Sequence, residues 1–379
     1  MLETIRRMGP VSRAQIARDR GLSKPTVSLA LTALEHARLV REAGRSSGGK
    51  GPTAQLYELN PAAGWVVGID VGRDWVRAAV ANLTGDIVAR RDERARSKSA
   101  RTLIQQIGGL AHGLADEAGI GWRKVTHATV GTPGVFQASR DQVALAHNLP
   151  GWGRRGLVEA VREELGTNVT FENDVNLATV GEHRHGLGKG VVNFVYLHIG
   201  TGVGAGLVLN GELFRGATGA AGEIGYLPLG AEGSRDAASR RRGALEAVAG
   251  AAAIKAEART LGMKPPLTPR RILAAARKGD TIAAMVVASE ARRIAVAIAS
   301  VVPVVDPELV ILGGGIGRNG DLLLEPIEHE LHAISPFHPR IEVSSLGEEV
   351  ELRGAVALAL QAAQEQVFRR GAQAGGWAV

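Results

Sequence analysis

The sequence predicts an α/β protein in two parts: a short three-helix module with a β-hairpin at the N-terminus, and a larger α/β body behind it. The chain has 379 residues, more than one ordinary hydrophobic core accommodates, and 45% of them are hydrophobic. Apolar residues recur at helical spacing in three short segments of residues 1–36, and two strand-like segments follow before residue 60. From Trp65 onward, apolar strands alternate with helices and glycine-containing turns.

The first two helices of the module each have a local signal. Leu2, Ile5 and Met8 repeat at helical spacing and predict the first helix. Ser12, followed three residues later by Gln15, is the pattern of a capping box. A second helix is therefore expected to begin directly after Ser12.

The third helix is predicted to begin after Ser23, which can cap it, with Pro25 tolerated in the first turn. Its buried stripe is expected to consist of Val27, Ala30, Leu31 and Leu34. The other face carries short polar and basic side chains that suit phosphates and base edges in a DNA major groove: Ser23, Lys24, Thr26, Ser28 and Thr32.

A hairpin with a basic loop completes the module. Residues 39–42 and 55–59 alternate as strands do. The segment between them, residues 44–52, is rich in glycine and serine and is predicted to be the wing of a winged helix-turn-helix. Arg45 and Lys50 are its expected contacts to phosphates or to the minor groove.

The charge distribution agrees with DNA binding by this module. The whole chain has a net charge of +7, and residues 1–60 hold ten Lys and Arg against five Asp and Glu. Most of the surplus thus lies in the first sixth of the chain, as expected for a small DNA-binding domain. The alternative is a three-helix cap on an enzyme, with a polar face that is only solvated.

Several classes of protein are disfavoured. No apolar run approaches the roughly 20 residues needed to cross a bilayer, and the N-terminus does not resemble a secretory signal. The chain contains no cysteine, which excludes disulfides and thiolate metal sites. We expect a cytoplasmic protein without a membrane partner.

The body is expected to open with a buried strand, residues 65–72, that ends in an acidic turn, followed by strands at 76–80 and 87–90. The charged residues 89–101 are expected to form a solvated connection to a helix at 103–118, and 125–130 to form a strand. Further on, residues 194–199 are a predicted strand that enters the glycine-rich segment Gly200–Gly206. Such a segment can nest an anion with successive backbone N–H groups, or it can be a tight hairpin. Asp174, predicted to lie at a strand end, can accept a proton from a hydroxyl or hold a sugar hydroxyl without chemistry.

Several motifs in this order resemble the ROK family (repressors, open reading frames and kinases) over nearly the whole chain. The motifs are Glu172-Asn173-Asp174, Gly200–Gly206, Gly222-Glu223-Ile224-Gly225 and His147–Trp152. The N-terminal module resembles the winged helix of the ROK repressors, which the ROK kinases lack. The resemblance implies two actin-like (ribonuclease-H-like) lobes of the sugar-kinase fold with a sugar cleft.

The resemblance also implies domains and site residues. The expected domains are a winged helix-turn-helix (1–60), a small lobe (61–175, with a C-terminal helix 355–379 packing back) and a large lobe with the dimerisation region (176–354). The residues implied to bind sugar are Asn148, Asn173, Asp174, Glu223, Tyr226 and Glu246. The implied phosphate loop contains Gly200, Thr201, Gly202 and Gly204. Asp174 matches the catalytic base of the kinases.

Three departures from the family pattern favour a regulator over an enzyme. Where family kinases have an Asp-x-Gly-Gly-Thr loop, this chain has Asp70–Trp75, in which the carboxylate of Asp74 would repel ATP phosphates. The zinc segment has no cysteine, and Tyr226 replaces the family histidine, so neither zinc nor ATP is expected as a cofactor. In the zinc region, residues 235–242 carry four arginines that form either a solvated loop or a site for an anionic ligand or phosphorylated sugar.

The sequence therefore predicts a sugar-responsive transcriptional regulator, a repressor of carbohydrate-utilisation genes, with operator DNA and a sugar or sugar phosphate as its partners. Two copies are expected to join as a homodimer, or as a dimer of dimers, so that two recognition helices meet two half-sites. No catalytic residue is expected. The alternatives are an ATP-dependent hexose kinase with Asp174 as its base, and a DNA-binding protein with a vestigial cleft.

Overall fold

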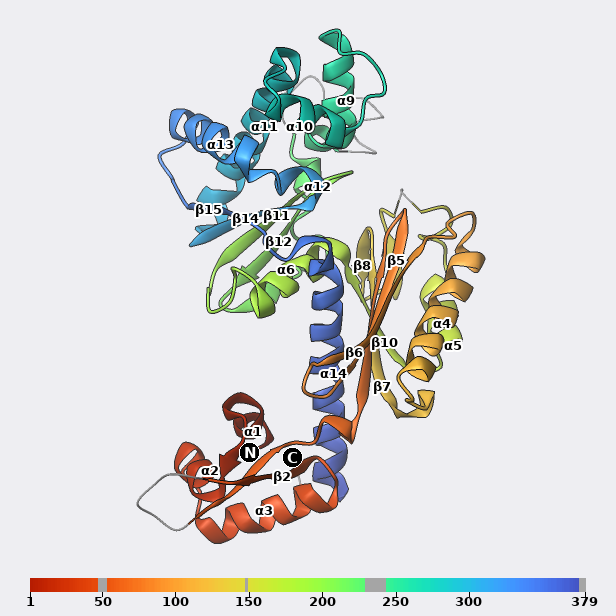
Figure 1. The fold of residues 1–379 in the computed structure, drawn as a ribbon, viewed down its shortest axis with the longest axis vertical. Helices are drawn as coiled ribbons and strands as arrows, with labels where there is room; N and C mark the ends of the chain where they lie inside the picture. Colours follow the sequence, from red (N-terminus) through yellow and green to blue (C-terminus); the bar gives the residue numbers. More distant parts are fainter. Residues whose placement is uncertain (47–52, 147–148, 229–242, 375–379) are drawn as a thin grey trace. The chain divides into compact units, whose positions relative to one another are not determined.

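The computed structural model describes residues 1–46, 53–146, 149–228 and 243–374, which form two compact units (Figure 1). Of these residues, those within 1–131, 147–171 and 355–379 form unit 1, and those within 132–146 and 172–354 form unit 2. The N-terminal module thus shares a unit with the first part of the body. Residues 132–146 belong to unit 2, although the sequence analysis placed them in the small lobe.

The N-terminal module has the three predicted helices and a small antiparallel sheet. Its elements are α1 (Leu2–Met8), β1 (Val11–Ser12), α2 (Arg13–Arg20), α3 (Lys24–His36), β2 (Val40–Arg45) and β3 (Gln55–Leu59), with the strand order β1-β3-β2. Ile5, Val27, Leu31 and Tyr57 are almost fully buried in one core. Burial of such side chains contributes about 1.5–3 kcal/mol each, which is how short helices of this kind become stable.

The predicted caps are confirmed. The Ser12 hydroxyl accepts from Gln15 N (3.3 Å), and the Gln15 side chain accepts from Ser12 N (2.9 Å), which completes the capping box of α2. The Ser23 hydroxyl accepts from Thr26 N (3.2 Å) at the start of α3. Gly21, in the left-handed conformation, ends α2 and makes the turn between these two helices.

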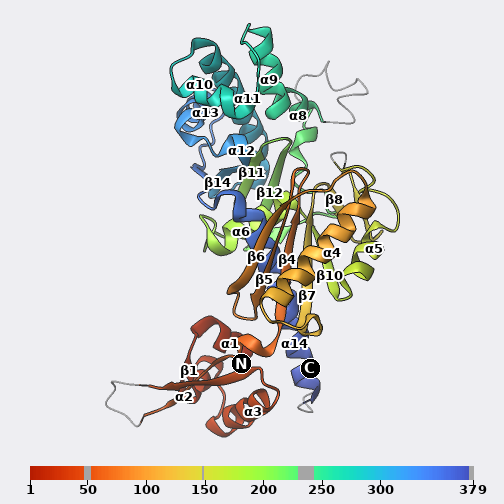
Figure 2. The ribbon, with the colours of Figure 1, turned by 45° about the vertical axis from the view of Figure 1, so that its right-hand side comes forward.

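The body in unit 1 is a five-stranded sheet with helices on both faces (Figures 1 and 2). The strands are β4 (Trp65–Val71), β5 (Trp75–Asn82), β6 (Ile87–Arg94), β7 (Val125–Thr132) and β10 (Asn168–Asn173), in the order β10-β7-β4-β5-β6. The helices are α4 (Ala100–Glu117), α5 (Leu157–Leu165) and, from Ala355 on, α14 (Val350–Ala374). Short 3₁₀ turns lie at Pro61–Ala63 and Trp122–Lys124.

One expectation in this part was wrong. The charged residues 89–101 are not a solvated connection, because β6 continues to Arg94 and α4 begins at Ala100. β6 is the edge strand, where charged side chains are tolerated and discourage pairing with other chains. Its charges also find partners on β5: Asp92 lies 3.6 Å from Arg77, and Arg94 stacks over Trp75.

Unit 2 repeats the same strand arrangement. Its strands are β11 (Phe194–Ile199), β12 (Val203–Leu209), β13 (Glu212–Phe214), β14 (Leu309–Gly313) and β15 (Arg340–Val343), in the order β13-β12-β11-β14-β15. In each sheet three consecutive antiparallel strands are followed by two later strands on the other side, of which the first pairs in parallel. This duplication confirms the predicted two-lobed, actin-like fold. A two-stranded hairpin, β8 (Val135–Gln137) and β9 (Gln142–Ala144), also belongs to unit 2.

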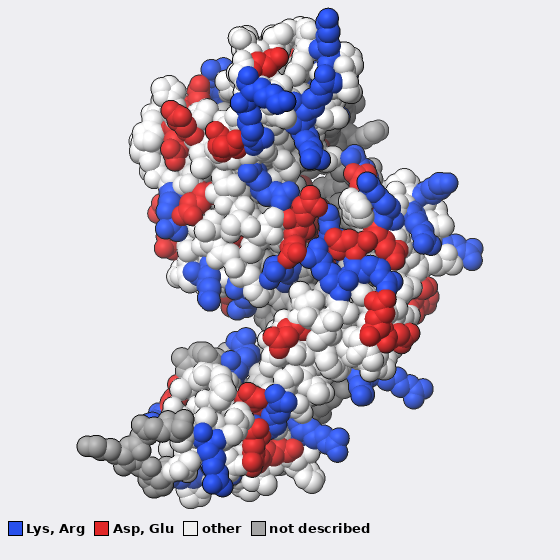
Figure 3. Space-filling view, viewed as in Figure 1, with Lys and Arg blue, Asp and Glu red and all other residues white. Residues whose placement is uncertain are grey.

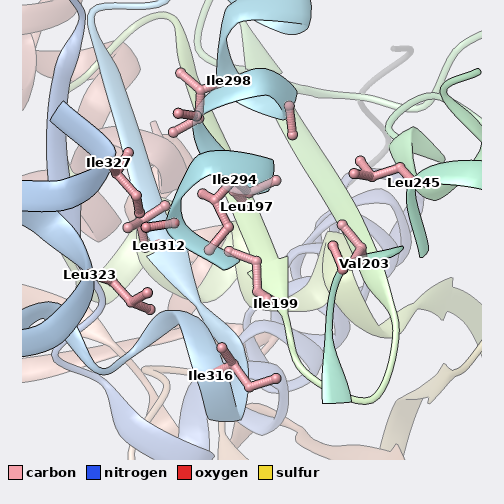
Figure 4. Close-up of a cluster of buried hydrophobic side chains, with 14 of the residues drawn as sticks. Leu197, Ile199, Val203, Leu245, Ile294, Ile298, Leu312, Ile316, Leu323 and Ile327 are labelled. Carbon is pink, nitrogen blue, oxygen red and sulfur yellow. The ribbon is translucent and has the colours of Figure 1, made fainter. Parts of the chain in front are cut away.

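The core of unit 2 lies on both faces of its sheet. The helices of this unit are α6 (Asp174–His185), α8 (Ala244–Val248), α9 (Ala251–Thr260), α10 (Pro269–Arg277), α11 (Thr281–Val305), α12 (Gly314–Gly317) and α13 (Gly320–Ile334), with 3₁₀ turns η3 (Ile224–Tyr226) and Gly347–Glu349. Leu197 and Leu312 face Ile294 of α11 and Ile327 of α13 (Figure 4). The alternate strand residue Tyr196 packs on the opposite face with Ala178 of α6. No helix in the described ranges is long and apolar enough to span a membrane.

Candidate functional site

The outer face of α3 carries the predicted DNA contacts. Lys24, Thr26 and Thr32 are exposed, whereas Ser28 is half-buried and its carbonyl accepts from the Thr32 hydroxyl (3.1 Å). Ser23 is also exposed, but its hydroxyl is engaged in the cap and lies 2.7 Å from the Thr26 hydroxyl. Lys24 is therefore the long cationic side chain that this face offers at the start of the helix.

The structure adds one residue to this face that the sequence analysis missed. Leu29 lies on α3 and is 61% exposed, unusual for a leucine in a helix with an apolar core face. An apolar side chain on a recognition helix suits the methyl group of thymine. Leu29 is two residues away from both Val27 and Leu31, which lie on the buried face of the helix. This spacing places Leu29 on another face and was the signal available in the sequence.

The wing is described in part. Arg45, at the end of β2, is exposed, and Lys50 lies outside the described residues. On the visible face of this module, basic and acidic side chains alternate, and no continuous basic patch is seen there (Figure 3). Some of the bases are paired: Arg41 lies 2.7 Å from Glu58.

In unit 2, Asn173 and Asp174 lie where β10 runs into α6. Asn173 is the N-cap of α6: its side-chain oxygen accepts from Asn176 N (3.1 Å), and its amide donates to Gly134 O (3.0 Å). Asp174 accepts from Val175 N (2.9 Å) in the first turn, where a helix favours negative charge. Both side chains are half-buried, and the Asn173 amide also donates to Asp174 Oδ1 (3.1 Å), so the two predicted sugar contacts are held together at the start of α6.

A third residue of this junction, Glu172, was identified from the sequence only as part of the Glu172-Asn173-Asp174 motif and was given no role. Glu172 is only 6% exposed, and its carboxylate accepts from Arg215 Nε (2.6 Å), Asn176 Nδ2 (2.8 Å) and Asn173 N (3.1 Å). It therefore holds the backbone of Asn173 and the start of α6 in place. Its position beside Asn173 was a signal, but its partner Arg215 is 43 residues away in the chain.

The glycine-rich segment Gly200–Gly206 is a tight hairpin, the second of the two predicted alternatives. Ile199 pairs with Val203, so Gly200, Thr201 and Gly202 form the turn, and Gly200 N donates to Gly202 O (3.0 Å). Gly204 lies in β12, where a Cβ atom would be 3.3 Å from Val175 of α6. Gly204 thus allows α6 to pack closely on β12, and the phosphate-loop role of the segment stays a prediction.

Glu223, Tyr226 and Glu246 gather beside this turn. Glu246 Oε2 accepts from Val203 N (3.2 Å), the first residue after the turn. Burial raises the pKa of the Glu223 carboxyl, and the nearby charge of Glu246 raises it further. The pKa of Tyr226 is raised by burial and by both carboxylates. Two carboxylates and a phenol together can accept and donate the hydrogen bonds that a polyol requires.

The predicted sugar residues described in the structure thus form two groups, both attached to the start of β12. Asn173 and Asp174 lie at the start of α6, which packs on β12. The Glu246 carboxylate accepts from the backbone N–H of Val203, the first residue of β12. Asn148 and the arginine-rich segment 235–242 lie outside the described residues. In the parts of the chain that are described, no group of three or more His, Asp or Glu side chains is arranged to hold a metal ion.

In unit 1, the aspartate before the predicted acidic turn forms an ion pair with an arginine of the next strand. Asp70, 4% exposed at the end of β4, forms an ion pair with Arg77 of β5 (Oδ2···Nη1, 3.2 Å). Burial raises the pKa of Asp70, and the Arg77 guanidinium opposes that shift. In the turn that follows, Asp74 is exposed and lies 3.3 Å from the Arg73 guanidinium. The carboxylates of Asp70 and Asp74 are thus each paired with an arginine of the same β-hairpin.

Comparison with known proteins agrees with the geometry. A family model described as the ROK family matches residues 66–362. The chain is 28% identical to the xylose repressor of Caldicellulosiruptor bescii, with 95% of this chain and 94% of the repressor covered. It is 30% identical to the glucokinase of Halalkalibacterium halodurans, with 81% of this chain and 98% of the glucokinase covered.

The solved structures that resemble this chain also include both a sugar kinase and a transcriptional regulator. The ROK hexokinase from Thermus thermophilus is 29% identical, with a TM-score of 0.67, and covers 79% of this chain and 99% of its own. A ROK family transcriptional regulator described as a homologue of the E. coli MLC protein is 22% identical, with a TM-score of 0.82, and covers 98% of this chain and 96% of its own. At that identity the regulator shows the fold alone, but the shared fold takes in nearly the entire chain.

Proposed function

The chain belongs to the ROK family, and on that premise we propose that it is a transcriptional repressor of carbohydrate-utilisation genes whose operator binding responds to a sugar. The observation that carries the proposal is the winged helix at the N-terminus, with the exposed polar face of α3, joined to a ROK body. A sugar kinase activity alone does not account for such a module. The protein then acts in the cytoplasm, on double-stranded DNA.

Sugar binding is assigned to the two groups of side chains around β12, with Asn148 as a further contact carried over from the family motif. A sugar bound there must favour the arrangement of the protein that does not bind DNA, and DNA must then weaken sugar binding by the same factor. A homodimer would place two α3 helices on half-sites separated by about one or a few DNA turns. A sugar or a sugar phosphate both fit this scheme.

The test is binding of the purified protein to its own upstream DNA at fixed salt, with and without a panel of sugars and sugar phosphates that includes xylose and glucose. We expect selective binding that one member of the panel weakens at least tenfold. Glu246→Gln should leave DNA affinity unchanged and reduce the response to that sugar. If the protein binds selectively neither to this DNA nor to any other candidate promoter, the proposal is refuted.

Lys24 supplies a prediction for the DNA interface. Because Lys24 is exposed at the start of α3, we expect Lys24→Ala to weaken operator binding about threefold to tenfold and to lower the salt slope of log K by about one. Fluorescence anisotropy at several salt concentrations measures both. Lys278→Ala, which removes an exposed lysine at the end of α10 in unit 2, is the control and should change neither. An unchanged salt slope in Lys24→Ala would show that Lys24 does not contact phosphate.

A sugar kinase is the second candidate, and the position of Asp174 at the start of α6, in the motif of the family's catalytic base, favours it. The Asp70–Arg77 ion pair argues against it. Phosphorylation of the sugar panel with ATP and magnesium distinguishes the two functions. Product that disappears in Asp174→Asn would establish the enzyme.

A further inference from the structure

A buried carboxylic acid lies behind the sugar-binding residues, on a helix that contributes none of them. Glu290 is in the middle of α11 and is 0% exposed. Its Oε1 accepts from Gly250 N (2.8 Å) in a fully buried hydrogen bond. Burial of a carboxyl group among the apolar residues of the unit 2 core is costly unless its oxygens are bonded, so the hydrogen bond to Gly250 is the interaction that offsets this cost.

The hydrogen bond to Gly250 connects Glu290 to the β11–β12 turn. Gly250 joins α8 to α9, and the next residue, Ala251, donates its N–H to Gly200 O in the turn (2.9 Å). Gly250 has φ +86°, and a Cβ atom there would lie 3.2 Å from Gly200 O, so the two backbones are in direct contact. α8, immediately before Gly250, carries Glu246, which binds the other side of the same turn at Val203 N.

Two charged groups face Glu290. Arg293, one turn later on α11, has its Nη1 3.8 Å from Glu290 Oε2 and 2.7 Å from Oε2 of Glu257 on α9. The Arg293–Glu257 pair is close, but it is not aligned as a hydrogen bond, and among the described residues Glu290 Oε2 has no hydrogen-bond partner. Burial raises the pKa of Glu290 to about 7; the Gly250 N–H and Arg293 oppose the shift, and Glu257 adds to it.

We propose that Glu290 is a positioning residue of the effector site: through Gly250 it holds the α8–α9 junction, and with it Glu246 and the β11–β12 turn, in the geometry that binds ligand. It does not touch the ligand. The inference rests on the proposed function for what the site binds, but the positioning itself is a property of the ligand-free protein. Ionisation of Glu290 favours states in which the junction opens to water, so the turn should loosen as the pH rises.

Hydrogen exchange of the ligand-free full-length protein tests the positioning directly. In Glu290→Ala, peptides that cover 199–206 and 243–252 should lose at least tenfold protection, because Gly250 N has lost its acceptor. In Glu290→Gln, which keeps an acceptor oxygen, protection should stay within threefold of wild type at pH 6. Glu182→Ala is the matched control for Glu290→Ala: Glu182 is also 0% exposed and also accepts a backbone N–H, that of Leu187 (2.9 Å), but its partners Leu187 and Ser344 lie outside both peptides, which should stay unchanged.

A pH series separates positioning from general stability. After correction for intrinsic exchange rates, wild-type protection in these peptides should fall about threefold to tenfold between pH 6 and pH 8, while Glu290→Gln stays flat. Equal pH dependence in the two proteins, or full protection in Glu290→Ala, would overturn the proposal. If a member of the sugar panel binds, its Kd should rise at least tenfold in Glu290→Ala and less than threefold in Glu290→Gln. If no sugar binds the wild type, the proposed function fails, and the exchange data still decide the role of Glu290.

Discussion

Replacement of Arg77 by alanine is expected to lower the free energy of unfolding of unit 1 by about 3–5 kcal/mol, because it leaves a buried charge without its partner. Asp70 is 4% exposed, and Arg77 Nη1 is 3.2 Å from its carboxylate. Trp65, Trp75, Trp122 and Trp152 lie in unit 1, and the fifth tryptophan, Trp377, lies outside the described residues, so tryptophan fluorescence during urea unfolding reports on this unit.

Two further variants isolate the cause. Asp70→Asn in the Arg77→Ala background removes the unpaired charge and should recover part of the loss. Arg73→Ala breaks the neighbouring pair with Asp74, but these side chains are 52% and 61% exposed, so the change should be below about 1 kcal/mol. If Arg77→Ala costs no more than Arg73→Ala, the Asp70–Arg77 pair is not the buried element that we describe.

The elements that sequence reasoning predicted best are those with short-range signals. Ser12 and Ser23 cap helices through residues three positions away, and the strand β4 (Trp65–Val71) opens with five residues, 65–69, that carry no polar side chain except the indole of Trp65. The charged edge strand β6 was predicted only in its first part, because its composition resembles that of a loop. Its strand character comes from pairing with β5, which no local pattern contains.

The candidate site was predicted through its motifs and not through its geometry. The resemblance placed Asn173, Asp174, Glu223 and Glu246 in one site, and their attachment to β12 is compatible with that. The supporting contacts came only from the structure, because their partners are far apart in sequence: 43 residues separate Glu172 from Arg215, and 40 separate Gly250 from Glu290. A glycine-rich motif is also ambiguous by nature. An anion nest uses the left-handed conformations that glycine adopts readily, whereas a close approach of helix to strand needs the missing Cβ. At Gly206 an added Cβ would lie 1.8 Å from Thr179 Oγ1 of α6, so the structure shows the second there.

A close approach that leaves no room for a Cβ atom is also the basis of the second large effect that we expect, at Gly222. Gly222 has φ +88°, its carbonyl accepts from Ala205 N (2.8 Å), and a Cβ atom on it would lie 1.9 Å from Ala205 O. Gly222→Ala therefore adds left-handed backbone strain, which costs about 1–2 kcal/mol, and a backbone clash, which costs about 1–3 kcal/mol. We expect unit 2 to lose about 2–5 kcal/mol of unfolding free energy, measured by hydrogen exchange of its core peptides in a denaturant series.

Gly211→Ala is the matched control, because Gly211 has a similar φ of +77° in the β12–β13 turn, with no atom within 4 Å of an added Cβ. It should cost only the conformational strain, about 1–2 kcal/mol. Since Glu223 directly follows Gly222, a displaced backbone there also moves a carboxylate that we propose to bind sugar. Gly222→Ala should therefore abolish the sugar response, while DNA binding, which we assign to the N-terminal module in unit 1, should persist. Equal losses of stability in the two variants would mean that strain alone acts, and that the approach of residue 222 to β12 can relax without cost. A larger loss of unfolding free energy in Gly222→Ala would instead show that Gly222 is needed for the backbone contact with β12. Its effect on the ligand would then be indirect.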